Sequence, residues 1–322
     1  MTRVGVIGAG AFGTALASVA RLGGNNVTLW GRDPAQITAM QAQGENTKYL
    51  PDVALPEGLH LTNDLGDLAQ SDIILMVLPA QQLRSFLARA DLPTQAPVLL
   101  CAKGIESDTG LLQQQILTES LPNTPIAVLS GPGFASEMTR GKPTALSLGC
   151  DDPKTGAWLQ GVLSSQTLRL YLTQDTTGVA LGGALKNVYA IACGLVVGAG
   201  LGESARAALM TRGFAELARL AASMGAKTET LMGLSGFGDL ALSCTSLQSR
   251  NFAFGEKLGR EGAFGTGKTV EGIATAQAVL ALAARQNVEM PIAQAVADVL
   301  DGRQEIAQAL HTLMSRPLKP EA

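Results

Sequence analysis

The sequence predicts an α/β protein of two domains, a doubly wound domain over residues 1–177 and an all-helical domain over residues 178–322. In the first half, short runs of apolar and β-branched residues alternate with helical segments, which is typical of a parallel sheet with right-handed helical crossovers. After about residue 175 the chain becomes rich in Ala and Leu at helical spacing, so we expect only helices there. A chain of 322 residues is also long for a single core.

The predicted elements of the first domain follow one another in a regular order. Val4 to Ile7 form the first strand, a glycine-rich turn follows, and Thr14 opens a helix that two glycines close. The run DIILMVLP is almost uniformly apolar, as expected for a parallel strand that is covered on both faces. The strand segments are RVGVIGAG (3–10), NNVTLWGRD (25–33), DIILMVLP (72–79), PVLLCAKG (97–104), IAVLSGPG (126–133) and TALSLGC (144–150).

The predicted helices of the second domain begin at the segment TQDTTG (173–178), where we place the domain boundary. They are apolar and rich in glycine, which suits helices that pack on one another or that form the interface of a homodimer. Their segments are GVALGGALKNVYAIACGLVVGAG (178–200), AALMTRGFAELARLAASMG (207–225), RNFAFGEKLG (250–259) and EGIATAQAVLALAARQ (271–286).

The composition narrows the classes of function. A net charge of −3 without any run of Lys or Arg gives no indication of a nucleic-acid partner. The four cysteines form no C-x-x-C pair and the two histidines lie in unrelated contexts, so we expect no metal site. The longest apolar stretch is short and glycine-rich and follows Lys186 and Asn187, which argues against a membrane span. We therefore expect a cytoplasmic protein that does not span a membrane.

Two glycine motifs compete as the phosphate-binding loop. GAFGTGKT (262–269) fits the phosphate-loop pattern of ATPases, whereas GAGAFG (8–13) fits the dinucleotide fingerprint. A phosphate-binding loop needs a buried strand before it and a helix after it. The residues before Gly262 are charged and helix-like, but the residues before Gly8 form a strand. The sequence therefore favours a Rossmann-type dinucleotide-binding domain over an ATPase.

Each glycine of the fingerprint has an expected role. Gly8 allows the tight turn, Gly10 lets a pyrophosphate approach the backbone, and Gly13 brings the helix close to the strand. About twenty residues further on, the second strand ends at Arg32 and Asp33. A carboxylate at this point suits the ribose hydroxyls of NAD, whereas an arginine suits the 2′-phosphate of NADP. We expect NADP(H) to be preferred, with NAD(H) as the alternative.

The best candidate for a catalytic base is Lys186. Oxidation of an alcohol to a ketone needs a hydride acceptor and a base for the hydroxyl proton, and neither histidine is well placed for this. At helical spacing, small residues such as Gly182 and Gly183 lie beside Lys186, so a ligand can approach closely. Partial burial would also lower the pKa of its amine. The alternative is a lysine that extends along a helix surface into solvent.

Further polar residues follow the predicted strands. Lys103 ends the strand PVLLCAK, where it would hold an anionic or polarised oxygen at the carboxyl end of the sheet. SGPGFASE (130–137) offers backbone N–H groups to the same crevice. Asp239 lies in the glycine turn GFGDL, and SRN (249–251) precedes a helix, so that Arg250 and the helix N-terminus suit a phosphate. The alternatives are an aspartate that caps a helix and an arginine that is only solvated.

Taken together, ten segments carry a resemblance to a known family. They are GAGAFGTALA, LWGRD, ENTKYLP, AKGIE, SGPGFASEMTRGKPTA, GGALKNVYAIACG, AALMTRGFAEL, GLSGFGDLALSCTS, QSRN and TVEG. The order G-A-L-K-N, G-x-G-D-L, S-R-N is highly specific, and the chain resembles the bacterial-type NAD(P)-dependent glycerol-3-phosphate dehydrogenases nearly end to end. The resemblance implies reversible conversion of dihydroxyacetone phosphate to sn-glycerol 3-phosphate, which feeds phospholipid synthesis.

The resemblance also implies roles for individual residues. Lys186 is implied as the proton acceptor, and Lys103 as a contact of both substrate and cofactor. The residues implied at the substrate site are Lys103, Gly131, Gly133, Lys186, Asp239, Ser249, Arg250 and Asn251. The residues implied at the cofactor site are Gly8, Gly10, Ala11, Phe12, Gly13, Arg32, Lys103, Ala135, Arg250, Thr269 and Glu271. No metal is implied.

Three positions depart from the family's pattern. Gly133 stands where SGPSFA has a serine, Ala11 stands where a serine is usual, and Ser204 replaces a common asparagine. These departures concern substrate affinity and single cofactor contacts rather than the type of reaction. Two other hypotheses remain open on the sequence: a reductase of the same plan that acts on a 3-hydroxy acid or a ketopantoate-like substrate, and a nicotinamide-sensing module that has lost its chemistry.

Overall fold

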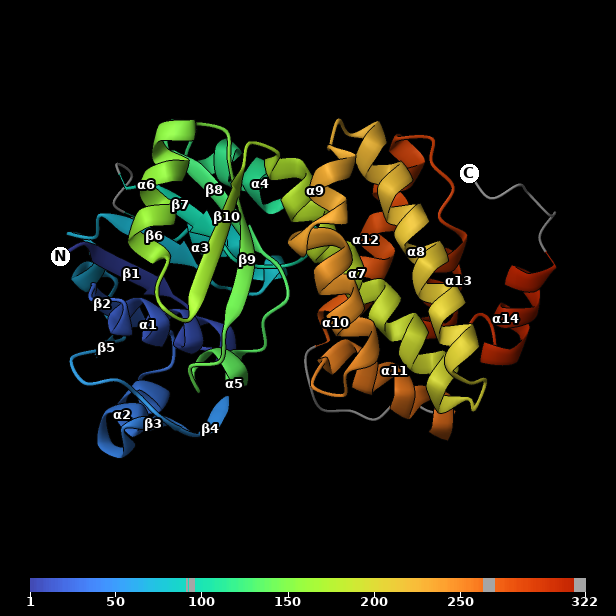
Figure 1. The fold of residues 1–322 in the computed structure, drawn as a ribbon, viewed down its shortest axis with the longest axis horizontal. Helices are drawn as coiled ribbons and strands as arrows, with labels where there is room; N and C mark the ends of the chain where they lie inside the picture. Colours follow the sequence, from blue (N-terminus) through green and yellow to red (C-terminus); the bar gives the residue numbers. More distant parts are fainter. Residues whose placement is uncertain (91, 93–95, 263–269, 316–322) are drawn as a thin grey trace.

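In the computed structural model, the first half of the chain forms a layered α/β unit and the second half forms a bundle of helices beside it (Figure 1). The structure describes residues 1–90, 92, 96–262 and 270–315. This arrangement confirms the predicted fold class. The exact division at residues 177 and 178 stays a prediction.

The first unit is built on an eight-stranded sheet with the order β10-β9-β8-β7-β6-β1-β2-β5. Neighbouring strands are parallel except β8 and β9, which run antiparallel. The chain adds β2 and β5 on one side of β1 and then returns to add β6 on the other side, so the direction of the strand order reverses between β1 and β6. Open α/β sheets usually bind ligands beyond the carboxyl ends of the strands at such a point. The strands are β1 (Arg3–Ile7), β2 (Asn26–Trp30), β5 (His60–Thr62), β6 (Ile73–Met76), β7 (Val98–Leu100), β8 (Ile126–Ser130), β9 (Thr144–Cys150) and β10 (Leu168–Thr173).

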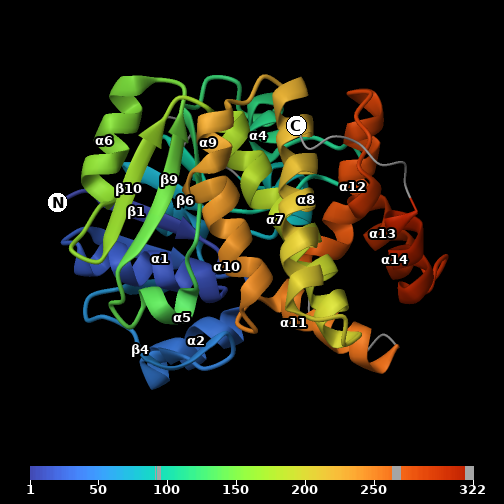
Figure 2. The ribbon, with the colours of Figure 1, turned by 45° about the vertical axis from the view of Figure 1, so that its right-hand side comes forward.

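Helices cover both faces of the sheet because its central strands are apolar on both sides. In β6, Ile73 and Leu75 pack into one core layer, whereas Ile74 and Met76 pack into the other. Figure 2 shows α1, α5 and α6 together on one side of the sheet. The helices are α1 (Ala11–Leu22), α2 (Pro34–Gln43), α3 (Leu83–Leu87), α4 (Gln113–Ser120), α5 (Ala135–Met138) and α6 (Pro153–Leu163), with the 3₁₀ turns η1 (Leu65–Leu68) and η2 (Ala80–Gln82) and the hairpin β3 (Glu45–Asn46) and β4 (Leu50–Ala54).

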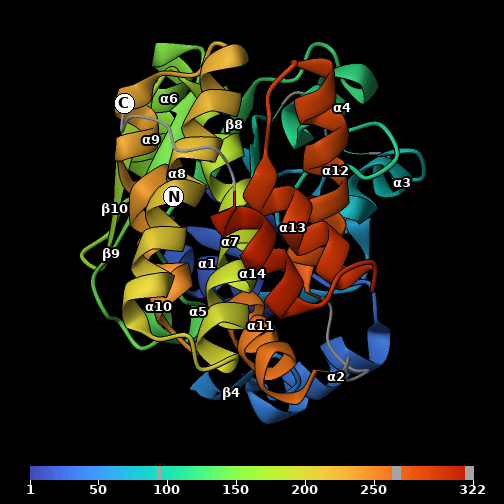
Figure 3. The same cartoon turned by 90° about the vertical axis from the view of Figure 1, so that its right-hand side faces the viewer.

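The second unit is built around one central helix, α7, which packs against α8, α10, α11, α12 and α13 (Figure 3). Its elements are α7 (Thr176–Gly198), α8 (Glu203–Ser223), α9 (Thr228–Met232), the π-helical turn η3 (Leu234–Gly238), α10 (Asp239–Thr245), α11 (Arg250–Glu261), α12 (Glu271–Arg285), α13 (Pro291–Leu300) and α14 (Ile306–Met314). By length and composition α7 could cross a membrane, but it is the buried core helix of this unit.

Glycines let α7 and α11 approach closely. A Cβ at Gly194 of α7 would overlap the Phe252 carbonyl oxygen, and a Cβ at Gly255 of α11 would overlap the Ile191 carbonyl oxygen. Any larger residue at either position would push the two helices apart. This close packing holds the amino end of α11 against the middle of α7, near Lys186.

Several local predictions were wrong. The helix after the first strand begins at Ala11 rather than at Thr14, and Asp239 is the first residue of α10 rather than part of a turn. The prediction also lacked β3, β4, β5 and β10. Three of these strands have five or fewer residues, and β10 alternates buried and exposed residues at the sheet edge, so none of them forms a continuous apolar run.

Candidate active site

The glycine turn after β1 has the shape of a dinucleotide phosphate site. Gly8 adopts a φ of 120°, and a Cβ there would lie 2.6 Å from the Val77 carbonyl oxygen. A Cβ at Gly13 would overlap the Gly8 carbonyl oxygen. At Gly10, in contrast, a Cβ would meet no atom of the described residues within 4 Å, and no side chain among them caps α1. The open space and the free N–H groups at the start of α1, from Ala11 onward, fit a pyrophosphate.

Two side chains hold this turn in place, and neither of them was predicted as a site residue. Gln36 Nε2 donates to the Ala9 carbonyl oxygen at 2.7 Å, and Asn46 Nδ2 donates to the same oxygen at 3.1 Å. Asn46 also donates to Thr14 Oγ1 at 2.8 Å. Asn46 belongs to the motif ENTKYLP, so its place in that motif was the available signal.

The two charged residues after β2, Arg32 and Asp33, have different surroundings. Asp33 caps α2, since its side chain accepts a hydrogen bond from Ala35 N at 3.0 Å, and it lies 3.8 Å from Lys48 Nζ. Arg32 is exposed beside it, just beyond the carboxyl end of β2. The carboxylate is therefore engaged in helix capping, and the guanidinium is the group that remains available to a ligand at this point.

The central feature is a buried cluster of two lysines around one aspartate. Asp239 Oδ2 lies 2.6 Å from Lys103 Nζ, and Asp239 Oδ1 lies 3.1 Å from Lys186 Nζ. The three side chains are 2%, 14% and 12% exposed for Asp239, Lys103 and Lys186, so water screens the charges weakly. Lys103 also donates to the Gly131 carbonyl oxygen at 2.9 Å, and Lys186 donates to Ser243 Oγ at 2.7 Å.

The cluster perturbs the protonation of its members in a useful direction. Burial lowers the pKa of the Lys186 amine from its ordinary value of 10.5. Asp239 and Glu271 act in the opposite direction, and the Lys103 charge adds to the lowering. Burial alone would raise the pKa of Asp239, but the two lysines outweigh it and the pKa of this carboxyl lies below its usual value. A lowered lysine pKa makes a neutral amine accessible as a base.

The glycines beside Lys186 make room for protein atoms rather than for an open ligand channel. A Cβ at Gly182 would lie 2.5 Å from the Ser235 carbonyl oxygen of η3. A Cβ at Gly183 would overlap Ser130 Oγ at the end of β8. Close packing at these two positions brings α7 against the carboxyl end of the sheet, where Lys103 follows β7. The same packing thereby assembles the cluster.

A chain of buried amides connects the loop after β7 to α7, α11 and α12 behind the cluster. Asn187 Nδ2 donates to the Lys103 carbonyl oxygen at 3.3 Å. Asn251 Nδ2 donates to Asn187 Oδ1 at 2.8 Å, and Gly272 N donates to Asn251 Oδ1 at 3.0 Å. The roles of Asn187 and Ser243 were not predicted, although Asn187 directly follows Lys186 and Ser243 lies one helical turn after Asp239.

The remaining predicted substrate residues lie around this chain. Ser249 caps α11 through a hydrogen bond that its side chain accepts from Phe252 N at 3.4 Å. Arg250, the first residue of α11, is exposed. Gly131 has a φ of 146°. A Cβ at Gly133 would lie 3.2 Å from Thr144 Cγ2, so there is little room for the serine of the family's pattern.

Three further predicted cofactor residues belong to α1, α5 and α12. The Phe12 ring lies 5.8 Å from Lys103 Nζ, between the glycine turn and the lysine. Ala135 begins α5, which packs against α1. Glu271 begins α12, next to Gly272 of the amide chain, and its charge acts on Lys186. Thr269 lies outside the described residues. Within the part of the chain that the structure describes, no group of three His, Cys, Asp or Glu could hold a metal.

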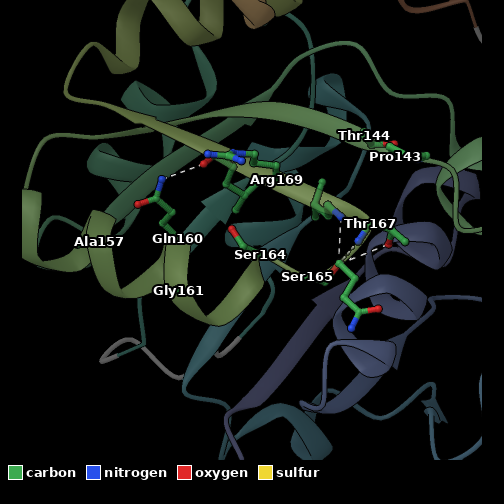
Figure 4. Close-up of a pocket in the computed structure, with 12 residues that line it drawn as sticks. Pro143, Thr144, Ala157, Gln160, Gly161, Ser164, Ser165, Thr167 and Arg169 are labelled. Atoms are coloured by element: carbon green, nitrogen blue, oxygen red, sulfur yellow. Dashed lines mark hydrogen bonds between the residues drawn. The ribbon is translucent and has the colours of Figure 1, made fainter.

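A surface hollow of about 600 Å³ between α6 and β10 has no part in this site (Figure 4). Gln160, Ser164 and Arg169 lie around it. Gln160 Nε2 donates to the Leu170 carbonyl oxygen at 2.8 Å, which protects the outer edge of β10. None of the residues around the hollow is among the predicted site residues.

Both the sequence and the structure of the chain match known proteins over nearly its whole length. The sequence profiles of the N-terminus and C-terminus of NAD-dependent glycerol-3-phosphate dehydrogenase match residues 3–156 and 175–311. The glycerol-3-phosphate dehydrogenase [NAD(P)+] of Rhodospirillum rubrum is 48% identical, and the alignment covers 99% of this chain and 93% of the relative. That of Roseobacter denitrificans is 51% identical, with 99% of both chains covered. The crystal structure of glycerol-3-phosphate dehydrogenase from Coxiella burnetii superposes with a TM-score of 0.91 at 36% identity and covers 98% and 99% of the two chains.

Proposed function

The chain belongs to the NAD-dependent glycerol-3-phosphate dehydrogenase family, and from this premise we propose which of its residues carry out the reaction. The activity is that of an NAD(P)-dependent sn-glycerol-3-phosphate dehydrogenase, an oxidoreductase. It interconverts dihydroxyacetone phosphate and sn-glycerol 3-phosphate. The observation that carries the proposal is the buried cluster in which Asp239 contacts both Lys103 and Lys186.

The glycine turn and the residues across the crevice would hold the cofactor, which supplies a hydride acceptor or donor at its nicotinamide when bound. The open position at Gly10 and the uncapped start of α1 support pyrophosphate binding there. Phe12 and Ala135 would line the crevice towards Lys103, with Glu271 and Arg250 on its far side. The free guanidinium of Arg32, next to an Asp33 that is already a helix cap, supports a preference for NADP(H).

Lys186 acts as the base in the direction of oxidation. Its neutral amine takes the proton of the C2 hydroxyl of glycerol 3-phosphate, and a bound nicotinamide would supply the hydride acceptor. In the direction of reduction, the same amine in its protonated form returns the proton to the carbonyl oxygen. Asp239 holds the amine in position and stabilises its protonated form, and the Lys103 ammonium stabilises the charge that develops on the oxygen.

The phosphate group would lie at the amino end of α11. Arg250 is exposed there, and the start of a helix favours an anion. Ser249 and Asn251 support this end from within, since Ser249 caps the helix and Asn251 is held on both sides by the amide chain. Gly131 and Gly133 would line the opposite wall. Turnover of dihydroxyacetone phosphate but not of dihydroxyacetone is the expected specificity.

Replacement of Lys186 by methionine tests the assignment. The variant keeps most of the side-chain volume but has no amine, so we expect kcat to fall by a factor of roughly 10² to 10⁴, with cofactor binding retained. Lys257→Met is the matched control, because Lys257 is an exposed residue of α11. NADPH consumption with dihydroxyacetone phosphate measures turnover, and fluorescence titration with NADPH measures binding. A kcat near that of the unmodified protein would remove Lys186 from its role.

The cellular setting is part of the same proposal. Production of glycerol 3-phosphate for phospholipid synthesis and a cytoplasmic location agree with the family. A homodimer is proposed as well, although the apolar α7 is already buried among the other helices of the same chain. The ATPase hypothesis loses its support, because the residues that precede Gly262 form α11 rather than a strand. The hypotheses of a ketopantoate-like reductase and of a sensor module give way to the family assignment over the full length. Light scattering of the purified protein would measure the oligomeric state.

A further inference from the structure

One buried carboxyl in the helical unit has no part in the reaction described above. Glu216 of α8 is 1% exposed. Its Oε1 accepts a hydrogen bond from Ile292 N at 2.7 Å, and its Oε2 accepts hydrogen bonds from Ala293 N at 3.3 Å and from the Tyr189 hydroxyl at 3.4 Å. The two N–H groups belong to the first turn of α13, where a negative charge is favoured. A single carboxyl thus joins α7, α8 and α13.

Tyr189 is the point at which this carboxyl contacts the catalytic helix. It is 1% exposed and lies three residues after Lys186 on α7, so both side chains project from neighbouring positions of one helix. One turn before Glu216, Gly213 lets the ring rest directly on α8, since a Cβ there would lie 2.6 Å from Tyr189 Cδ1. Helix α8 therefore contacts Tyr189 at two points, with Gly213 beside the aromatic ring and Glu216 at the hydroxyl.

We propose that Glu216 is a positioning residue for Lys186, which acts by holding Tyr189 and the first turn of α13 on one carboxylate. This inference rests on the proposed role of Lys186. Lys186 and Tyr189 belong to one continuous helix, so a change that displaces α7 at Tyr189 also displaces the backbone that carries Lys186. A displacement of a catalytic group by about 1 Å can slow a reaction by roughly 10²-fold even when the substituted residue lies far from the chemistry.

The protonation of Glu216 gives this device a sensitivity to pH. Burial raises the pKa of Glu216 to about 7, although the N–H groups of α13, the Arg219 charge and the Tyr189 hydroxyl act in the opposite direction. The thiol of Cys244 of α10 is also titratable and lies close enough to Tyr189 to act on its hydroxyl. The carboxylate can accept all three hydrogen bonds, whereas a protonated carboxyl must itself donate one. The form that holds Tyr189 fully is therefore the one above pH 7.

Glu216→Gln, Tyr189→Phe and the control Glu203→Gln test the proposal in the full-length enzyme. Glu203 is the other glutamate of α8 and is exposed. For reduction of dihydroxyacetone phosphate by the unmodified enzyme, we expect kcat to rise with pH through an inflection near 7, whereas loss of the Lys186 proton would only lower it. Glu216→Gln should lose this inflection and lower kcat about tenfold at pH 8, with KM changed less than twofold. Glu203→Gln should leave both kcat and the inflection unchanged.

Tyr189→Phe keeps the ionisation of Glu216 but removes the hydroxyl through which Glu216 would act on α7. This variant also tests the proposal if Glu216→Gln does not fold. It should lose the inflection in kcat while its unfolding midpoint still falls as pH rises towards 7, because Glu216 still ionises. An unchanged kcat profile in Glu216→Gln, or a retained inflection in Tyr189→Phe, would overturn the inference. Failure of the Lys186 assignment is distinguishable, since it would appear as retained turnover in Lys186→Met and would leave the pH dependence of unfolding intact.

Discussion

Replacement of Asp239 by asparagine is the perturbation that reaches furthest into the site. The change keeps the shape of the side chain but removes the negative charge that faces both Lys103 and Lys186. At about 3 Å and an effective dielectric constant of about 20, each attraction amounts to roughly 5 kcal/mol. Removal of one partner from a buried pair typically costs about 3–5 kcal/mol, which agrees with this figure. Loss of this attraction removes an interaction that favours the protonated amine, so the pKa of Lys186 should fall further below its already lowered value.

The sign of this shift predicts different effects on the two directions of reaction. With a lower pKa, the Lys186 amine of Asp239→Asn carries its proton in a smaller fraction of molecules, so reduction of dihydroxyacetone phosphate should fall by about 100-fold. Oxidation of glycerol 3-phosphate needs the neutral amine, so it should lose less, and its acidic limb should move to lower pH. Stopped-flow assays of both directions between pH 6 and pH 10 would measure these changes.

A matched control is available on the surface. Asp72 pairs with Arg3 at 2.6 Å but both side chains are substantially exposed, so Asp72→Asn should leave both directions unchanged. Equal losses in oxidation and reduction by Asp239→Asn, or an acidic limb at the same pH as in the unmodified enzyme, would refute the electrostatic reasoning.

Three further substitutions test the cofactor site. Arg32→Ala should weaken NADPH binding by roughly 10- to 100-fold and leave NADH binding nearly unchanged, because only NADPH carries the 2′-phosphate; equal losses for both cofactors in titration would contradict this assignment. Gly10→Ala should fold with an unchanged melting temperature but bind the cofactor poorly, since its Cβ would enter open space at the phosphate position. Gly13→Ala should instead destabilise the protein, because its Cβ would overlap the Gly8 carbonyl oxygen, and thermal unfolding with and without NADPH distinguishes the two outcomes.

The fold could be predicted from sequence where burial imposes a continuous pattern. The strand DIILMVLP was found because both faces of β6 are covered, and α7 was found because it is apolar along its length. The edge strands β5 and β10 were not predicted, because β5 is short and β10 alternates buried and exposed residues. The antiparallel step from β8 to β9 depends on the path of the connecting loop, for which the strand residues themselves carry no signal.

The candidate site could be predicted residue by residue but not as an arrangement. Lys103, Lys186 and Asp239 were each proposed from their own motif, and Lys103 and Asp239 are 136 residues apart. Their contact is created by packing, in particular by Gly182 and Gly183, which admit η3 and Ser130 against α7. Side chains that act through other residues, such as Ser243, could not be found in this way, because serine in a helix is ordinary until its neighbour in space is known.

The neutral amine of Lys186 is tested most directly by the pH dependence of kcat/KM for glycerol 3-phosphate oxidation, measured for the unmodified enzyme and for Lys186→Arg. We expect the unmodified enzyme to gain activity as pH rises through an inflection below 10.5, because its lowered pKa releases the base within that range. The arginine variant, which stays protonated throughout, should be slow at every pH. A flat profile for the unmodified enzyme, or comparable oxidation by the arginine variant, would contradict the proposed mechanism.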